Sequence, residues 1–196
     1  MSSILKVDTI QDQSGNNIIN ESGDTITIGA SGDTITIPSG ATIDLSNATQ
    51  TGVGGTNTPA FSVYLTSGTT LTNNTLTKVS FDTENYDTNN AVSSGTFTVP
   101  AGQGGKYFIY AQLSIACTSQ SSTWIYKNGS IVTQNVIEAS GNYFSDISST
   151  ASALLDLTAG DYIEIYGRGI STGTVTLNGG SASSQRCTFS GYKIIE

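Results

Sequence analysis

A short repeat near the N-terminus constrains the fold of this chain more than any other feature. Residues 22–28 and 31–37 both read Ser-Gly-Asp-Thr-Ile-Thr-Ile, and Ser-Gly pairs recur from residue 14 to residue 40 every eight or nine residues. Gly and Asp favour turns, whereas alternating Ile and Thr favour extended backbone, so each copy predicts a turn followed by a short strand. Such a strand buries only two aliphatic side chains, which is too little for independent stability.

The repeat therefore needs apolar surface from neighbouring copies. Those copies could stack within one chain as a β-roll or come from other chains around a common axis. Because there are only about four units and no larger cap, we favour three chains wound together. The residues expected to form this trimeric stalk are Ile26, Ile28, Ile35, Ile37, Ile43 and Leu45.

The pattern changes after the repeat. Residues 49–59 are rich in Gly, Thr and Asn and lose the alternation, which is typical of a hinge between domains. We predict an N-terminal segment at residues 1–20, a repetitive β stalk and hinge at 21–58, and a head at 59–196.

The head reads as a series of short strands without helices. A long apolar strand is expected from Lys106 to Ala116, and Asn128-Gly129 predicts a hairpin because both residues tolerate positive φ. Residues 159–161, Ala-Gly-Asp, predict a second hairpin. About ten strands in this segment predict an all-β fold, a ten-stranded jelly-roll sandwich.

Composition excludes several partners. Only 11% of residues are charged, and seven Lys and Arg against fifteen Asp and Glu give a net charge of −8. The cations are scattered, so the chain offers no basic patch for nucleic acid or for an anionic membrane surface. Lys6 and Asp8 interrupt the first apolar run, and no stretch approaches the ~20 apolar residues of a spanning helix. We expect synthesis in the cytosol, no nucleic acid and no membrane insertion.

Histidine is absent, which excludes Ser-His-Asp, Cys-His and zinc-hydrolase mechanisms. Carboxylates cluster at residues 82–87 and 156–164, but solvated carboxylates in turns and at strand edges are a better interpretation than a glycosidase pair. The oxygen-rich segment 82–90 leaves calcium open, although it lacks the glycine and terminal glutamate of an EF-hand loop. We predict no enzyme activity, no catalytic residue, no metal and no cofactor.

Two cysteines, Cys117 and Cys187, are too few for a disulfide scaffold. We expect them to be small buried side chains with free thiols, and a bridge stays open as the alternative. The aromatic residues Phe97, Phe108 and Trp124 lie in predicted strands, which favours the core over a ligand platform.

The head carries a series of short landmarks along its length. In order, they are Phe61-Ser62-Val63, Val79-Ser80-Phe81, Tyr86-Asp87, Gly95 to Pro100, Tyr107-Phe108, Tyr126 to Gly129, Leu157 to Asp161, and Phe189-Ser190-Gly191-Tyr192. With these landmarks the head resembles the globular-head family of the first complement component, a branch of the tumour-necrosis-factor-like trimeric jelly rolls. The head of that family usually follows a collagen stalk, but this chain has no Gly-X-Y run, so the repeat would take the place of that stalk.

The resemblance implies a homotrimer in which the chain enters and leaves the head at a base near the stalk. Four segments would then lie at the opposite, distal end: 66–77, 117–123, 138–148 and 170–185. The same geometry would bring the two cysteines close together. From these segments we predict receptor contacts by Asn73, Ser119, Asn142, Tyr143, Phe144, Thr172 and Asn178.

The opening residues 3–10 and the Ser-Gly-Asp-Thr-Ile-Thr-Ile repeat resemble tail-fibre and appendage proteins of bacteriophages. This resemblance implies a structural virion protein, made in the host cytoplasm, whose head contacts the host surface and has a surface glycan as one possible partner. The alternatives are a capsid decoration or cement protein and a glycan depolymerase. Attachment to capsid or tail proteins would use Ile4, Leu5, Val7 and Ile10.

Overall fold

The computed structural model describes residues 9–15, 17–22, 25–29, 31–44, 57–139 and 144–194, and the regular elements among them are all β-strands. None of these residues forms a helix able to span a bilayer. The chain divides into two compact units, residues 1–51 and 52–196. The predicted boundaries at residues 20 and 58 stay predictions.

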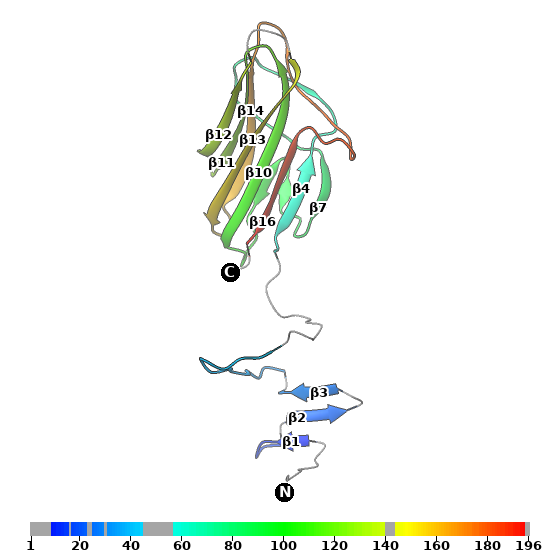
Figure 1. Ribbon diagram of the computed structural model, residues 1–196, viewed down its shortest axis with the longest axis vertical. Helices are drawn as coiled ribbons and strands as arrows, with labels where there is room; N and C mark the ends of the chain where they lie inside the picture. The colour runs from blue at the N-terminus through cyan, green and yellow to red at the C-terminus, as the bar shows by residue number, and fades with distance from the viewer. Residues whose placement is uncertain are drawn as a thin grey trace. The chain divides into compact units, whose positions relative to one another are not determined.

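The N-terminal unit contains a three-stranded antiparallel meander of β1 (Thr9–Gln11), β2 (Asn17–Ser22) and β3 (Thr25–Ile28) (Figure 1). The first repeat copy supplies β3, as expected. The second copy, residues 31–37, forms no strand. Two aliphatic side chains do not stabilise a strand by themselves, so this copy lacks the neighbouring surface that it needs.

Most of the described isoleucines of this unit are exposed in the single chain, whereas Ile19 is half-buried. Register places Ile10, Ile19 and Ile28 side by side across the meander. Side chains alternate along a strand, so Ile26, which is 69% exposed, lies on the same face as Ile28. Leu45, Ile4, Leu5 and Val7 lie outside the described residues. The exposed residues of the predicted stalk are Ile26, Ile28, Ile35, Ile37 and Ile43.

The head is a sandwich of two sheets, and the all-β jelly-roll prediction is confirmed. One sheet has the order β5-β15-β10-β16-β4-β7, with β13 pairing along the other side of β10. Its strands are β4 (Ala60–Tyr64), β5 (Thr69–Leu71), β7 (Thr83–Asp87), β10 (Gly105–Cys117), β13 (Phe144–Leu157), β15 (Val175–Leu177) and β16 (Thr188–Lys193).

The second sheet has the order β12-β11-β14-β9-β8, with β6 paired to β14. The described part of the head thus has thirteen strands where we expected ten, because five of them span only two or three residues. The strands of this sheet are β6 (Thr77–Lys78), β8 (Val92–Ser93), β9 (Thr96–Thr98), β11 (Gln120–Lys127), β12 (Ser130–Glu138) and β14 (Tyr162–Ile170).

One of the two predicted hairpins is present. Asn128 and Gly129 have φ values of 50° and 76° and join β11 to β12, as their tolerance of positive φ predicts. The second hairpin is wrong, because β13 pairs with β10 while β14 pairs with β11. The turn between β13 and β14 instead crosses from one sheet to the other. Turn residues alone do not distinguish these two connections.

An aromatic cluster fills the core between the sheets. The rings of Phe61 and Phe97 are stacked with centroids 4.6 Å apart, and Phe189 meets Phe61 edge-on at 4.8 Å. All three side chains are fully buried. A Cβ at Gly191 would lie 2.9 Å from the Phe61 ring, so glycine makes room there for the cluster.

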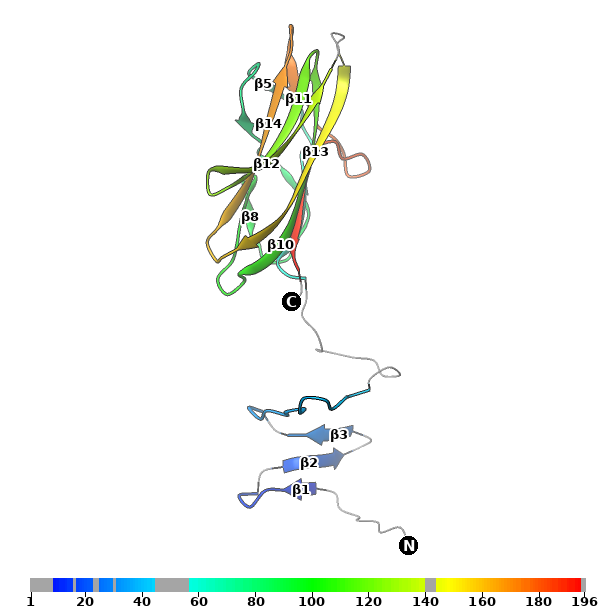
Figure 2. The same cartoon turned by 60° about the vertical axis from the view of Figure 1, so that its left-hand side comes forward.

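The head begins and ends at the same end. Its first strand β4 pairs with its last strand β16, with Ala60 opposite Tyr192 (Figures 1 and 2). We call this end the base and the opposite end the tip.

Candidate functional site

The tip of the head carries the turns between β10 and β11 and between β14 and β15, close to the segment after β5. The side chain of Asn73 joins two of these segments. Its Nδ2 donates to the carbonyl oxygen of Ser171 at 2.9 Å, and its Oδ1 accepts from the amide of Ser171 at 2.9 Å. The amide group of Asn73 is therefore engaged in holding the loops together.

Ser119 and Thr172 are tied into the same group of loops. The amide of Ser119 donates to the carbonyl of Ile170 at 2.9 Å, and the amide of Thr172 donates to Oγ1 of Thr118 at 3.0 Å. Thr172 is exposed, whereas Ser119 is half-buried. The structure thus brings together three of the predicted receptor-contacting residues, and their role stays a prediction.

Asn178 is half-buried and also engaged within the chain. Its Nδ2 donates to Oγ of Ser114 at 3.0 Å and to the carbonyl of Ser145 at 2.8 Å. Phe144 is 41% exposed and lines a shallow apolar groove of about 220 Å³ with Ile137, Glu138, Ala139 and Ile147. Asn142 and Tyr143 lie outside the described residues.

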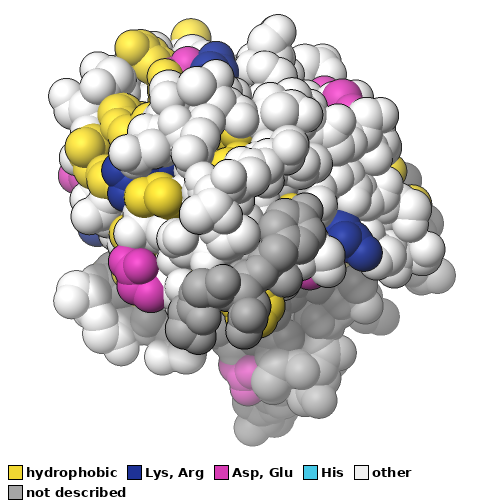
Figure 3. Space-filling view, turned by 90° about the horizontal axis from the view of Figure 1, so that it is seen from above, with side chains coloured by type: hydrophobic (Ala, Val, Ile, Leu, Met, Phe, Trp, Pro, Cys, Tyr) yellow, Lys and Arg dark blue, Asp and Glu magenta, His cyan; other side chains and the backbone are white. Residues whose placement is uncertain are grey.

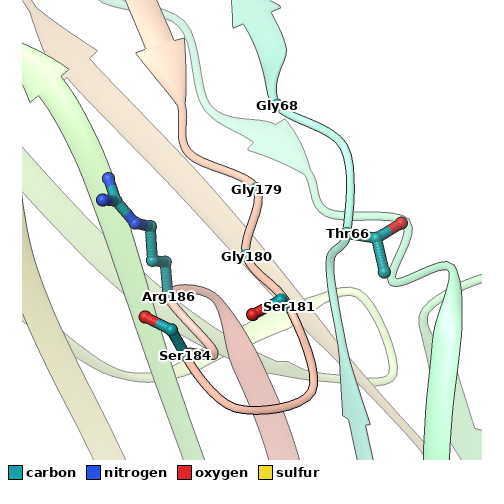
Figure 4. Close-up of a pocket in the computed structure, with 7 residues that line it drawn as sticks. All are labelled: Thr66, Gly68, Gly179, Gly180, Ser181, Ser184 and Arg186. Atoms are coloured by element: carbon teal, nitrogen blue, oxygen red, sulfur yellow. The ribbon is translucent and has the colours of Figure 1, made fainter.

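A polar cleft of about 380 Å³ lies at the side of the head, between the end of β4 and the segment from β15 to β16 (Figure 4). A Cβ at Gly179 would lie 2.3 Å from the carbonyl oxygen of Thr66, so only glycine permits this approach of two backbones. This part of segment 170–185 lies beside the strands and not at the tip, as Figure 1 shows. The lining residues are Thr66, Gly68, Gly179, Gly180, Ser181, Ser184 and Arg186.

Arg186 supplies the charge of the cleft, and that charge has a partner. Its Nη1 lies 3.0 Å from Oδ2 of Asp146, and both side chains are more than 40% exposed. The other carboxylate oxygen of Asp146 accepts a hydrogen bond from Ser114. The cleft is therefore polar but electrically balanced.

Both cysteines are free and buried, which confirms the preference for thiols. Thr188 pairs with Gln112, so Cys187 lies beside Leu113, four residues along β10 from Cys117, or about 13 Å. The expectation that the two cysteines lie close together is therefore wrong. Burial raises the pKa of Cys187 to about 11 and also raises the pKa of Cys117, so neither thiol is a ready nucleophile.

The clustered carboxylates have structural partners. Burial opposes ionisation of Glu164, but the hydrogen bond and charge of Lys78, at 2.7 Å, outweigh it and lower the pKa of Glu164. The backbone amide of Thr158, the Asn128 side chain and Lys127 hold the pKa of Asp161 well below its usual range. A general acid needs a raised pKa, so these groups are unsuited to that role.

Acidic residues of the segment 82–90 bond to the backbone. Asp82 accepts from the amide and hydroxyl of Thr66, each at 2.8 Å, and Asp87 accepts from the amide of Val92 at 2.8 Å. No group of three or more potential metal ligands occurs among the described residues.

Trp124 and Phe108 are not core residues, which corrects our prediction, whereas Phe97 is buried as expected. Side chains alternate along β11, and its inward positions include Thr123 and Ile125, so Trp124 points outward. A polar residue, Thr123, takes the inward position that an apolar residue usually occupies. Thr123 is satisfied by Ser149 of β13, whose hydroxyl lies 2.6 Å from Oγ1 of Thr123.

Two antiparallel sheets, chain ends at one base and loops at the opposite tip define a jelly roll of the kind shared by complement heads and tumour-necrosis-factor-like proteins. The family model described as C1q domain matches residues 60–194, and the chain belongs to this family. Such domains are non-enzymatic binding or structural modules.

Two solved structures are similar to this chain. The globular domain of zebrafish complement 1qA protein is 21% identical, with 69% of this chain and 97% of that chain covered and a TM-score of 0.45. Murine APRIL, in its crystal structure at pH 5.0, is 12% identical, with 69% and 99% covered and a TM-score of 0.51. A comparison with curated protein sequences gave no match.

Proposed function

We propose that this chain is a homotrimeric appendage of a bacteriophage particle, a tail fibre or a capsid-surface fibre, made in the host cytoplasm. Its N-terminal segment docks to capsid or tail proteins, its repeat forms a stalk, and the tip of its head contacts the host surface. The resemblance of residues 3–10 and of the repeat to phage appendage proteins supports the viral setting. The membership of the head in the C1q domain family supports a binding role without enzyme activity.

The exposed isoleucine face of the N-terminal unit carries this proposal. Ile10, Ile19 and Ile28 form one row, and Ile26 lies on the same face. Ile10, Ile26 and Ile28 are exposed, and Ile19 between them is half-buried. An apolar face of this kind on a small three-stranded sheet needs a partner surface in water, and the same face of two further chains would supply it. Ile10, which we assign to virion attachment, lies in this row, so the attachment and stalk regions share one apolar face.

The head has a second apolar row, on the outer face of the seven-stranded sheet. Leu154, Phe108 and Tyr192 lie opposite one another on β13, β10 and β16. Leu154 is 71% exposed, and the rings of Phe108 and Tyr192 have centroids 5.7 Å apart. Aromatic and aliphatic side chains grouped in this way are typical of subunit interfaces, and homotrimers are typical of the family.

A trimer gives three tips per fibre, and many fibres per particle multiply weak contacts. Linked sites raise the effective concentration for each further contact, so avidity far exceeds the affinity of one tip. Polar loops with single weak contacts are sufficient for attachment in this arrangement.

Sedimentation of the intact protein tests the proposal. We expect a species of three 20.3-kDa chains at micromolar concentration, and copies of the chain on purified phage particles by electron microscopy. A compact monomer that is absent from particles would contradict it.

Truncation distinguishes the alternatives. Removal of residues 1–58 should abolish attachment of a fibre to the particle, whereas a cement protein bound through its head would stay attached and add stability to the shell. Shorter products from host capsular or lipopolysaccharide glycans would instead indicate a depolymerase.

A further inference from the structure

The outer face of the six-stranded sheet carries a group of aromatic side chains that neither the core nor the apolar rows of the proposed trimer use. Register places Trp124 of β11 opposite Tyr166 of β14 and Gln134 of β12. Tyr126 lies two residues from Trp124 on the same face, and its ring centroid is 4.4 Å from that of Tyr166. We call Trp124, Tyr126, Tyr166 and the neighbouring Arg168 the aromatic strip.

Hydrogen bonds occupy the polar atoms of two of these rings. Nε1 of Trp124 donates to Oγ of the buried Ser122 at 2.9 Å, and the hydroxyl of Tyr166 donates to Oε2 of Glu164 at 3.3 Å. The three rings are half-buried, and Gln134 beside them is exposed. The strip therefore offers ring faces edged by an amide, on rigid strands instead of loops.

Arg168 gives the strip a charge without a carboxylate partner in the described part of the chain. Its Cζ lies 5.7 Å from the centre of the Trp124 ring, and Nη2 donates to Oε1 of Gln120 at 2.6 Å. Its Nε is buried and has no hydrogen-bond partner among the described residues. Arg186 in the side cleft, by contrast, is paired with Asp146. A guanidinium with no carboxylate partner among the described residues, set beside aromatic rings, favours an anionic group.

We propose that the aromatic strip binds an acidic glycan, with a pyranose ring stacked on Trp124 and Tyr166 and the sugar carboxylate bound by Arg168. The C–H groups of a pyranose carry partial positive charge and are attracted to the negative face of an aromatic ring, whereas its hydroxyl groups match the amide of Gln134. A planar guanidinium binds a carboxylate through two parallel hydrogen bonds. This inference rests on the proposed attachment to a host surface, names the chemistry of the ligand, and adds a contact on the side of the head to the contacts proposed for the tip loops.

The position of the strip suits a multivalent fibre. The apolar row of Leu154, Phe108 and Tyr192 lies on the other sheet, so association of heads through that row leaves the strip open to solvent. Seen from above the tip, hydrophobic and basic side chains gather together on one side of the head (Figure 3). A trimer then presents three strips on its outside.

The single tryptophan of the chain, Trp124, makes the strip directly observable by fluorescence. The intact protein is titrated with a glucuronate-containing oligosaccharide and, as matched control, with the same oligosaccharide after reduction of its carboxyl groups to alcohols. We expect the acidic sugar to change the Trp124 emission and to protect the ring from acrylamide quenching. Its binding should be at least about tenfold tighter than that of the reduced sugar, because hydrogen bonds between charged groups are lost in the latter.

Two substitutions separate the strip from the side cleft. Arg168→Gln keeps a hydrogen-bonding amide and should lower the affinity for the acidic sugar to that for the reduced sugar, whereas Arg168→Lys should retain part of it. Arg186→Gln, which removes a cation from the cleft, should leave the titration unchanged. Unchanged near-ultraviolet circular dichroism shows that each variant is folded.

The inference is overturned if neither sugar alters the fluorescence, if both bind equally, or if Arg186→Gln weakens binding and Arg168→Gln does not. None of these results bears on whether the protein is a trimer or is present on particles, because sedimentation and microscopy measure those two properties separately. A monomeric protein that binds the acidic sugar would instead contradict the proposed fibre and leave the strip as a glycan site.

Discussion

At the scale of single residues, glycine sets the spacing between β16 and the aromatic core. Gly191 stands between Phe61 and Ile109, and a Cβ there would lie 2.9 Å and 2.8 Å from their side chains. Its place in the Phe189-Ser190-Gly191-Tyr192 landmark thus has a packing reason. Phe189 faces the core on one side of the strand, and Tyr192 lies exposed near the base.

Gly191→Ala should lower the free energy of unfolding by about 1–3 kcal/mol, because one added methyl group overpacks the core. Denaturant unfolding measures the change. Gly173→Ala is the matched control, since a Cβ at Gly173 meets nothing within 4 Å. Equal stability of the two variants would show that the core accommodates the methyl group.

The Glu164–Lys78 pair predicts a dependence of stability on pH. The pKa of Glu164 in the fold is below its ordinary value of 4.5, so the ionised pair stabilises the fold above that pH. This contribution is lost as the pH falls through the lowered pKa. The difference in unfolding free energy between the natural protein and Glu164→Gln should be constant near neutral pH and shrink below about pH 4.5. A difference that grows in acid would contradict this.

At the scale of elements, the tip loops depend on one asparagine. Asn73→Ala removes two hydrogen bonds to Ser171 and should destabilise the tip by about 1–3 kcal/mol. Faster hydrogen exchange at the amides of Ser171 and Asn74 measures the effect. Thr172→Ala is the control, because its hydrogen bond at the tip uses only the backbone amide. If the hydrogen exchange of these amides is unchanged in Asn73→Ala, contacts other than those of Asn73 hold the tip loops in place.

The elements that local chemistry dictates were predictable from the sequence. Asn128 and Gly129 favour a tight turn because both tolerate positive φ, and the long apolar run around Ile109 and Leu113 forms β10. The partner of β13 was not predictable, because the turn at 158–161 suits a hairpin and a crossing equally well. The sheet to which a strand belongs depends on packing between residues that are distant in the sequence. The pattern of neighbouring residues does not contain this information.

The outward direction of Trp124 on β11 was not predictable from the sequence, because polar residues of this strand face the core. Along most strands the apolar residues face the core, but β11 turns Ser121 and Thr123 inward and Trp124 outward. Serine and threonine suit the interior only because Ser149 of β13 comes within hydrogen-bond distance. Adjacent residues of a strand face opposite sides, so only one of Trp124 and Ile125 can face the core. Both are large and apolar, and the sequence pattern therefore did not show which of the two points inward.

At the scale of the whole molecule, two separate apolar faces predict self-association. Leu154→Asp places a charge in the exposed row of the head and should shift the sedimentation profile from trimer toward smaller species, because an unpaired charge at an interface is costly. Thr172→Asp, with the same charge at the exposed tip, is the control and should remain trimeric. If Leu154→Asp alone sediments as the natural protein, association does not use this row of the head.

The adjacency of the first and last strands of the head has a practical consequence. Since β4 and β16 are hydrogen-bonded neighbours, residues 60 and 192 face each other across one ladder step. A brief glycine bridge there, with new termini opened in the exposed bend after Pro100, would give a circular permutant with the same ladders. Because both ends of the head lie at its base, we expect that the head can be fused to a different N-terminal stalk without changes to its core.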